Sequence, residues 1–408
     1  MSNVIDQVSD KVRSVRSEKE SNNLLSQFVN NEDVYFSTTQ YALLVKPPFA
    51  AMGSTKHSTL SKSVHDGLDF LKKIGVEDCI LVGAVSFDVE HESQLFVSRN
   101  FSFDHNHTRT YVNDNSRAPL IAKSIVEIPS KAEFKKGVEN ALSRFERNEL
   151  QKMVLSRTLN IKFDQDIQIK KTIETLEQTN QSGFVFGVKM FSEHLQHNQT
   201  LIGASPELLL SKRGNKISAM PLAGSEPRGK TDSEETILSQ RLLTSEKDLR
   251  EHALVVESIK QVLTPFCKYL NIPDSPSLIN TPTMWHLASS IEGELNNADV
   301  SSLDVALAMH PTPAVCGFPK AVARQAISEI ESHERGLFTG MVGWNDANGD
   351  GDWVVTIRCA TVEGKNATLY AGAGIVAGSS AEKEYQETGA KFNTMLNAFG
   401  LKGRLNEK

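Results

Sequence analysis

The sequence has few cysteines and no excess of positive charge. Its 408 residues include four cysteines, which stand far apart in the chain, at Cys79, Cys267, Cys316 and Cys359. No C-x-x-C pair is present, which excludes a zinc knuckle or a redox dithiol, and we interpret the four as reduced packing residues. The net charge of −6 and the lack of a basic stripe argue against binding to nucleic acid.

Long apolar runs and internal boundaries are also missing. The longest apolar run, residues 79–87, is too short to cross a bilayer, and the N-terminus lacks the apolar core of a signal peptide. We therefore expect a cytoplasmic protein without membrane contact. No repeat, low-complexity tract or Pro/Gly-rich linker divides the chain. With 39% apolar residues it can bury a sizeable core.

The chain is expected to consist of an N-terminal extension and one large domain. Val4, Val8, Val12 and Val15 follow a spacing close to four residues, which predicts an amphipathic helix within residues 1–35. Strands and helices then mix without a regular alternation. Strands are predicted at 41–45, 80–87, 153–163, 184–190 and 200–204, and helices at 60–74, 169–178, 233–264, 304–309 and 380–396. A hairpin of 340–344 with 353–360 favours an α+β fold.

Two segments imitate known ligand-binding motifs. Asp346-x-Asn348-x-Asp350 resembles the start of an EF-hand loop, but its twelfth position is Ile357, so a plain hairpin turn is the better interpretation. Gly372-x-Gly374-x-x-Ala377 resembles a dinucleotide-binding turn, yet no second strand with an acidic residue follows. The glycines permit close backbone approach to an anion, with free amides at the start of the next helix.

Acidic residues recur at helical spacing in two places. Glu384, Glu387 and Lys391 share one face of the C-terminal helix, and Asp248 and Glu251 lie three apart on an earlier one. Spacing alone favours solvated faces, with an ion pair between Glu387 and Lys391. Carboxylates from two helices would also suit Mg²⁺ if the helices met, which spacing cannot show.

Two charged residues stand among apolar neighbours. Lys152 opens an apolar strand and Glu207 precedes Leu-Leu-Leu. Desolvation lowers the pKa of a lysine and raises that of a glutamate, which prepares a general base and a general acid. An edge-strand lysine that reaches solvent is an equally good interpretation of Lys152.

Taken in order, these segments resemble the chorismate-utilising enzymes, which include isochorismate, salicylate, anthranilate and aminodeoxychorismate synthases. The motifs that carry the resemblance cover about residues 130–400. They are Lys152–Arg157, Gly203–Glu207, Pro221–Ser225, Ser245–His252, His310–Gly317, Ile357–Ala360, Ala371–Ile375 and Glu384–Lys391. The resemblance implies that residues 36–408 form one chorismate-binding α+β domain, with two stacked, mostly antiparallel sheets surrounded by helices.

The resemblance also implies roles for individual residues. Mg²⁺ would be held by Glu251 and Glu387, with Asp248 and Glu384 nearby. Arg358 and the amides around Gly372 and Gly374 would clamp the enolpyruvyl carboxylate, and Lys391 would add positive charge. Gly224, His286 and Ala314 match positions that line the family pocket. Lys152 would activate water for attack at ring carbon two, and Glu207 would protonate the departing hydroxyl at carbon four.

Three features favour one member of the family. The ammonia-using relatives typically lack a lysine at position 152, and salicylate synthases typically have threonine near Ala314, so both features favour isochorismate synthase. The segment Leu307–Ala314 resembles the siderophore-pathway type. Salicylate synthase and a menaquinone-pathway isochorismate synthase stay open. A nicotinamide-dependent oxidoreductase would require a second strand with an acidic residue after Gly374, and the presence of Lys152, Glu207, Glu251 and Glu387 argues against an inactive binding subunit. We expect a monomer that acts on chorismate, with at most transient contact to the next pathway enzyme.

Overall fold

The computed structural model describes residues 23–52, 57–76, 78–88, 93–109, 120–190 and 199–401. The predicted helix containing Val4 to Val15 lies outside these residues. A short 3-10 helix, η2 (Leu24–Gln27), precedes strand β1 (Val34–Ser37), which already pairs within a large sheet. The domain boundary near residue 35 stays a prediction.

The strands form two large sheets and one small one, and the pairs in the described residues are antiparallel. Sheet A runs in the order β18 (Gly317–Phe318), β8 (Lys152–Phe163), β22 (Asn366–Val376), β21 (Cys359–Glu363), β10 (Gln199–Ser205), β9 (Phe184–Met190), β1, β2 (Ala42–Val45) and β6 (Phe101–Asp104), with β7 (Ala122–Ile128) also beside β8. Sheet B runs in the order β14 (Cys267–Asn271), β17 (Ile291–Leu295), β12 (Lys216–Met220), β11 (Leu208–Arg213), β20 (Gly351–Val355), β19 (Met341–Asp346), β4 (Ile80–Val85), β5 (Gln94–Ser98) and β3 (Ala50–Ala51). Sheet C, which was not predicted, consists of β13 (Leu222–Pro227), β16 (Met284–Ala288) and β15 (Ser277–Asn280).

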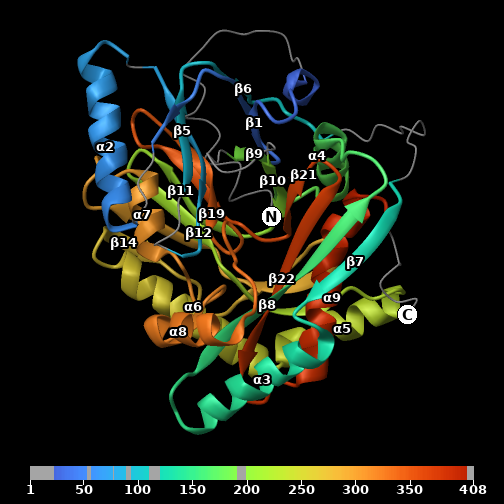
Figure 1. Ribbon diagram of the computed structural model, residues 1–408. Helices are drawn as coiled ribbons and strands as arrows, with labels where there is room; N and C mark the ends of the chain where they lie inside the picture. Colours follow the sequence, from blue (N-terminus) through green and yellow to red (C-terminus); the bar gives the residue numbers. More distant parts are fainter. Residues whose placement is uncertain are drawn as a thin grey trace.

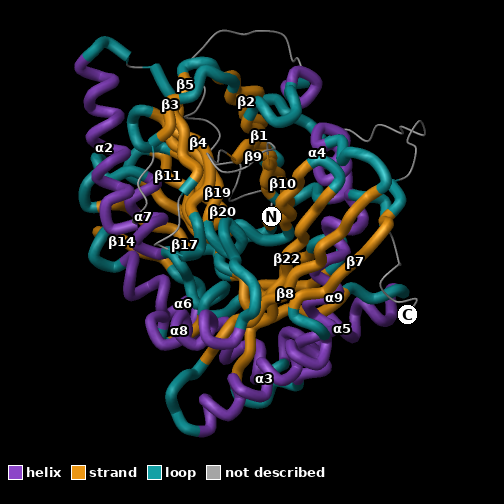
Figure 2. The backbone as a smooth tube through the Cα atoms, in the orientation of Figure 1, coloured by secondary structure: helices purple, strands orange, loops and turns teal. Residues whose placement is uncertain are grey.

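Helices cover the outer faces of the stacked sheets (Figures 1 and 2). They are α2 (His57–Lys73), α3 (Lys131–Glu146), α4 (Ile169–Thr179), α5 (Asp232–Thr244), α6 (Glu246–Leu263), α7 (Ser302–Met309), α8 (Lys320–Ile330) and α9 (Ala381–Ala398). Helices α4 and α9 pack on sheet A, whereas α2, α6 and α7 pack on sheet B. The predicted α+β architecture is confirmed.

The inner core lies between the two large sheets. Because successive strand residues point to opposite faces, Phe186 of β9 packs in the inner core while Val185 packs under the helices. Val82 and Trp344 of sheet B meet Phe186 from the other side. Both faces of the central strands are therefore buried, which explains their nearly continuous apolar sequence.

Two of the elements predicted from the sequence are wrong. The single helix predicted at 233–264 is broken at Ser245, whose extended backbone ends α5 and whose side chain accepts the Asp248 amide at the start of α6. The strand predicted at 353–360 ends at Val355, and the chain crosses from sheet B to sheet A before β21 begins at Cys359. Arg358 has φ of 52° at this crossing.

The two imitated motifs have ordinary structural roles. Asp346 Oδ1 accepts the amides of Asn348 and Asp350 at 2.9 Å, which makes the predicted hairpin turn between β19 and β20. Gly372 and Gly374 lie within β22, opposite Ser156 and Val154 of β8. The prediction that their amides stand at the start of a helix is wrong, and this antiparallel pairing excludes a dinucleotide-binding βα turn.

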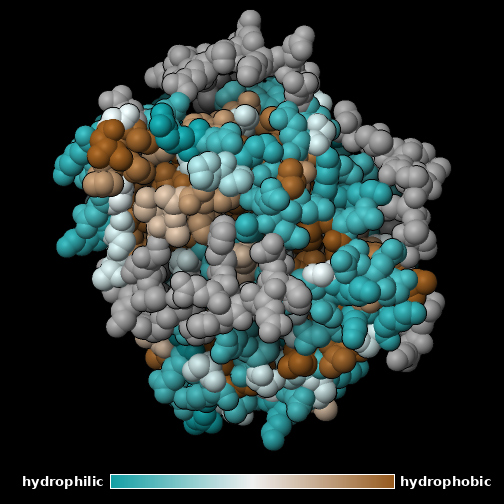
Figure 3. Space-filling model, turned by 45° about the horizontal axis from the view of Figure 1, so that its top comes forward, coloured by the Kyte–Doolittle hydropathy of each residue, from teal (hydrophilic) through white to brown (hydrophobic). Residues whose placement is uncertain are grey.

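The exposed surface is mixed in character. Hydrophilic residues cover much of the face in Figure 3, and hydrophobic residues gather in separate patches. Large apolar side chains with high exposure include Ile237 of α5 at 61%, Phe70 of α2 at 60%, and Ile74, which follows α2, at 58%. Among the helices of the described residues, none is long and apolar enough to cross a membrane.

Candidate active site

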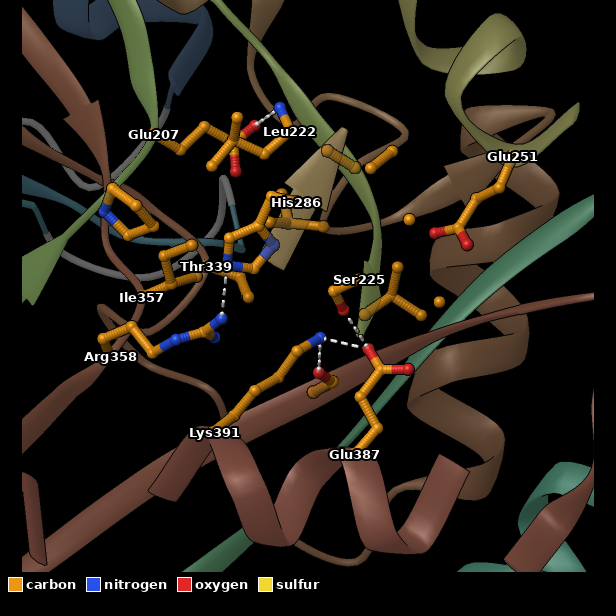
Figure 4. A pocket seen from close by; sticks show the side chains of 18 of the residues that line it. Glu207, Leu222, Ser225, Glu251, His286, Thr339, Ile357, Arg358, Glu387 and Lys391 are labelled. Atoms are coloured by element: carbon orange, nitrogen blue, oxygen red, sulfur yellow. Dashed lines mark hydrogen bonds and ion pairs between the residues drawn. The ribbon is translucent and has the colours of Figure 1, made fainter. Parts of the chain in front are cut away.

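A pocket lies where β8 and β22 of sheet A, sheet C, and helices α6 and α9 meet (Figure 4). Most of the site residues predicted from the sequence line it. They are Glu207, Gly224, Glu251, His286, Ala314, Arg358, Gly372, Gly374, Glu387 and Lys391. Lys152, Asp248 and Glu384 do not line the pocket but contact or neighbour residues that do. The structure therefore brings together side chains from distant parts of the sequence.

Lys152, the first residue of β8, lies behind the pocket residue Glu251. Its side chain is fully buried, and its Nζ lies 3.0 Å from Oε1 of Glu251, without the alignment of a hydrogen bond. A Cβ on Gly374 would lie 2.0 Å from the same Oε1. Glycine is therefore required at 374 so that the Glu251 carboxylate can approach β22 and Lys152. The interpretation of Lys152 as a lysine that reaches solvent is wrong.

Glu207 lies between β10 and β11 and is only 3% exposed. Its Oε1 accepts one weak hydrogen bond, from the Leu222 amide at 3.4 Å. Burial raises the pKa of Glu207 to about 7, although the Leu222 amide and the cations Lys152 and Arg358 oppose the shift. The carboxyl group can therefore exist in its protonated form near neutral pH, as a proton donor must.

Arg358 and His286 lie side by side in one wall of the pocket. Arg358 is 6% exposed, its Nε has no hydrogen-bond partner, and its Nη2 lies 3.5 Å from His286 Nε2. Burial lowers the pKa of Arg358 to about 10, so it stays charged at neutral pH. Burial, followed by the charges of Arg358 and Lys391, holds the pKa of His286 well below its usual range. A neutral imidazole beside a guanidinium with a free donor suits a carboxylate ligand.

Lys391 and Glu387 lie on the face of α9 that points into the pocket. Lys391 Nζ lies 2.6 Å from Glu387 Oε1 and donates to the carbonyl oxygen of Gly372 at 2.8 Å. Ser225 of β13 donates to the same Glu387 oxygen at 2.8 Å. Burial raises the pKa of Glu387, but Lys391 and Lys247 outweigh it and leave the pKa below its ordinary value. Glu387 is therefore an anion. The predicted ion pair between Glu387 and Lys391 is confirmed, but the prediction that this helix face is solvated is wrong.

Four carboxylates of α6 and α9 belong to this region: Asp248, Glu251, Glu384 and Glu387. Lys247 links the helices through a 2.9 Å ion pair with Glu384, whose other oxygen is buried without a hydrogen-bond partner. Burial and the charge of Glu387 raise the pKa of Glu384 to about 7. In the described part of the chain no three such side chains form a ready-made metal cage. Carboxylate oxygens in this number fit Mg²⁺, which is commonly held by one or two carboxylates with water and substrate oxygens.

Several residues of the site were not singled out from the sequence. Thr339 lines the pocket and has φ of 59°, a conformation that a β-branched residue rarely adopts. No pattern in the sequence predicts this conformation or its place in the pocket. Lys247 and Ser225 belong to the motifs Ser245–His252 and Pro221–Ser225, but the sequence alone gave neither residue a role. Their charge and hydroxyl group become meaningful once α6, α9 and sheet C are seen to meet.

The sequence matches a family model described as a chorismate binding enzyme over residues 3–400. The chain belongs to this family. Isochorismate synthase DhbC of Bacillus subtilis is 44% identical over 86% of this chain and 88% of its own. The vibriobactin-specific isochorismate synthase of Vibrio cholerae is 39% identical, over 87% and 86% of the two chains.

Solved structures of chorismate binding enzymes share the fold. A 2,3-dihydroxybenzoate-specific isochorismate synthase, DhbC of Bacillus anthracis, superposes with a TM-score of 0.88 at 40% identity, covering 94% of this chain and all of the other. The menaquinone-specific MenF of Escherichia coli superposes with a TM-score of 0.76 at 22% identity, covering 93% and 92%. The second likeness supports the fold alone.

Proposed function

We propose that this chain is an isochorismate synthase that supplies 2,3-dihydroxybenzoate synthesis for a siderophore. The observation that carries the proposal is a pocket lined by a buried Glu207, whose pKa is raised to about 7, and by Arg358 with an unpaired guanidinium donor. Behind this lining, an enclosed lysine, Lys152, contacts the pocket residue Glu251. The relatives named as a vibriobactin-specific and as a 2,3-dihydroxybenzoate-specific isochorismate synthase support the pathway assignment.

The reaction is an allylic substitution. A water molecule bonds to ring carbon two, the double bonds shift, and the hydroxyl group leaves carbon four. Lys152, when unprotonated, accepts the proton of the attacking water, and Glu207 gives its proton to the departing hydroxyl. Lys152 is the first residue of β8, whereas Glu207 lies in the loop between β10 and β11. The base and the acid can therefore face different sides of the ring.

Binding of the substrate uses the cations of the pocket. Chorismate carries two carboxylates, and we assign the enolpyruvyl carboxylate to Arg358 and the outward-facing amides of β22. Lys391 donates to the carbonyl of Gly372, so the backbone groups of Gly372 and Gly374 point away from β8, toward α9. Glu251 and Glu387 would hold Mg²⁺, which when bound supplies positive charge for the ring carboxylate.

The product distinguishes this function from its neighbours in the family. Ala314 lines the pocket where salicylate synthases are expected to carry threonine, and this favours release of isochorismate. Purified protein with chorismate and Mg²⁺ should yield isochorismate by chromatography. Salicylate with pyruvate would identify a salicylate synthase instead, and anthranilate formed with ammonia would refute the role of Lys152.

We further propose that the enzyme works as a cytoplasmic monomer on free chorismate. The enclosure of the site by elements of one chain supports this proposal. Light scattering during size-exclusion chromatography should give the mass of one chain, 45.0 kDa, with and without chorismate. A stable dimer would contradict the monomer.

A further inference from the structure

A buried ion pair between Glu331 and Arg335 stands behind the pocket wall. The two residues follow α8, and their side chains are 4% and 3% exposed. Arg335 Nε donates to Glu331 Oε2 at 2.8 Å, and Nη2 donates to Oε1 at 2.6 Å. This two-pronged geometry is specific to a guanidinium and a carboxylate.

The guanidinium of Arg335 also reaches three separate walls of the pocket. Nη2 donates to the carbonyl of Val154 at 2.8 Å, and Nη1 donates to the carbonyl of Val315 at 2.8 Å and to Thr339 Oγ1 at 3.3 Å. Val154, Val315 and Thr339 all line the pocket. With the two bonds to Glu331, all five N–H donors of Arg335 are used.

The pair completes an interrupted edge of β8. On this edge, β18 pairs with residues 152 and 153, and β7 pairs from Thr158 onward. Among the described residues no strand pairs with 155–157 there. Arg335 Nη2 donates a hydrogen bond to the carbonyl oxygen of Val154 at 2.8 Å, and Glu331 Oε1 accepts one from the Ser156 amide at 2.7 Å. A donor and an acceptor at these two places are what two residues of a neighbouring antiparallel strand would provide, one on each side of the position opposite Leu155.

We infer that Arg335 and Glu331 are positioning residues for the isomerisation. They act as a side-chain substitute for a short piece of antiparallel strand and fix the segment of β8 that follows Lys152 against the walls at Val315 and Thr339. This inference rests on the proposed function for its catalytic consequence. Since a displacement of about 1 Å of a catalytic group can cost roughly 100-fold in rate, the pair sets the rate more than the affinity for substrate.

The test compares Arg335→Lys with a matched control, Arg144→Lys, whose guanidinium pairs with Glu329 at 2.6 Å near the surface. Lysine keeps the charge but has three donors and no planar fork. We expect kcat for chorismate to fall at least about 30-fold in Arg335→Lys, with KM changed less than about 3-fold. The control should keep both constants.

Hydrogen exchange gives a readout that does not depend on activity. The Ser156 amide should exchange faster in Arg335→Lys and in Glu331→Asp, whose shorter side chain cannot reach both Arg335 and Ser156, and stay protected in the control. A folded Arg335→Lys with wild-type kcat would overturn the inference, as would a loss of activity that only follows the unfolded fraction.

The remaining outcomes are also decisive. If Arg335→Lys does not fold, Glu331→Asp is judged by the same kinetic criteria. Failure of both variants to fold would assign the pair to folding and overturn its positioning role. If the wild-type protein forms no isochorismate, the proposed function fails, while altered exchange at Ser156 would still support the substitution of a strand by the ion pair.

Discussion

Replacement of Glu207 by glutamine tests the proton donor and its buried setting together. The ordinary pKa of a glutamate is 4.5, and burial raises that of Glu207 to about 7. Only the protonated form can donate to the departing hydroxyl, so kcat/KM should fall roughly tenfold for each pH unit above 7. Glu207→Gln should lose roughly 10²- to 10⁴-fold in kcat/KM and should not show this decline.

The same substitution has a consequence for stability. A carboxyl whose pKa is raised on folding contributes stability that is present below the unfolded pKa and lost as the pH rises through the folded pKa. For Glu207 the window runs from 4.5 to about 7, and the shift corresponds to about 3 kcal/mol. Glutamine does not titrate. The difference in free energy of unfolding between Glu207→Gln and wild type should therefore shift in favour of the variant by up to about 3 kcal/mol as the pH rises from 4.5 to 8.

Two assays measure these effects. Initial rates of isochorismate formation between pH 5.5 and 9 give the decline in kcat/KM, and urea unfolding at pH 5 and pH 8 gives the stability difference. Glu149→Gln, which removes an exposed ion pair with Arg147, is the control. It should change neither the pH dependence of kcat/KM nor the free energy of unfolding. A Glu207→Gln enzyme with the wild-type rate, or one that keeps the alkaline decline, would refute the assignment of Glu207 as the acid.

Three further substitutions or treatments have definite expected outcomes. Gly374→Ala places a Cβ 2.0 Å from Glu251 Oε1, so kcat/KM should fall at least about 100-fold, whereas Gly389→Ala on α9, with its nearest neighbour at 3.6 Å, should behave as wild type in the same assay. Arg358→Lys keeps a charge but loses the fork, and KM for chorismate should rise at least about 10-fold; an unchanged KM would remove Arg358 from the carboxylate site. Chelation should abolish activity and Mg²⁺ should restore it, with Glu387→Gln needing at least about 10-fold more Mg²⁺ for half-maximal rate; calorimetry should show the same weakening, and equal Mg²⁺ binding would exclude Glu387 as a ligand.

Local patterns in the sequence were enough for many elements of the fold. The strand at 184–190 and the start of α4 at Ile169 were predicted as the structure has them. The break at Ser245 was missed because good helix-forming residues stand on both sides, and a serine cap inside a helical pattern is easily taken for a surface position. The crossing after Val355 was missed because the apolar pattern continues without interruption into β21, although the partner sheet changes.

The site was predicted by type of residue rather than by contact. Burial among apolar neighbours singled out Lys152 and Glu207, and helical spacing put Glu384, Glu387 and Lys391 on one face. Nothing in the local sequence could show that Glu251 pairs with Lys152 or that Gly374 makes room for that carboxylate. Those contacts depend on how α6 packs against β22. The strand substitute made by Glu331 and Arg335 was missed for the same reason.

The origin of the new hydroxyl group tests the central claim most directly. If water attacks ring carbon two, chorismate turned over in ¹⁸O-labelled water should give isochorismate that carries one labelled oxygen at that carbon, and Lys152→Ala should form no labelled product. Mass spectrometry of the product distinguishes the outcomes. Isochorismate without label would contradict addition of water with loss of the hydroxyl at carbon four, and unchanged chorismate with the wild-type protein would contradict the proposed function itself.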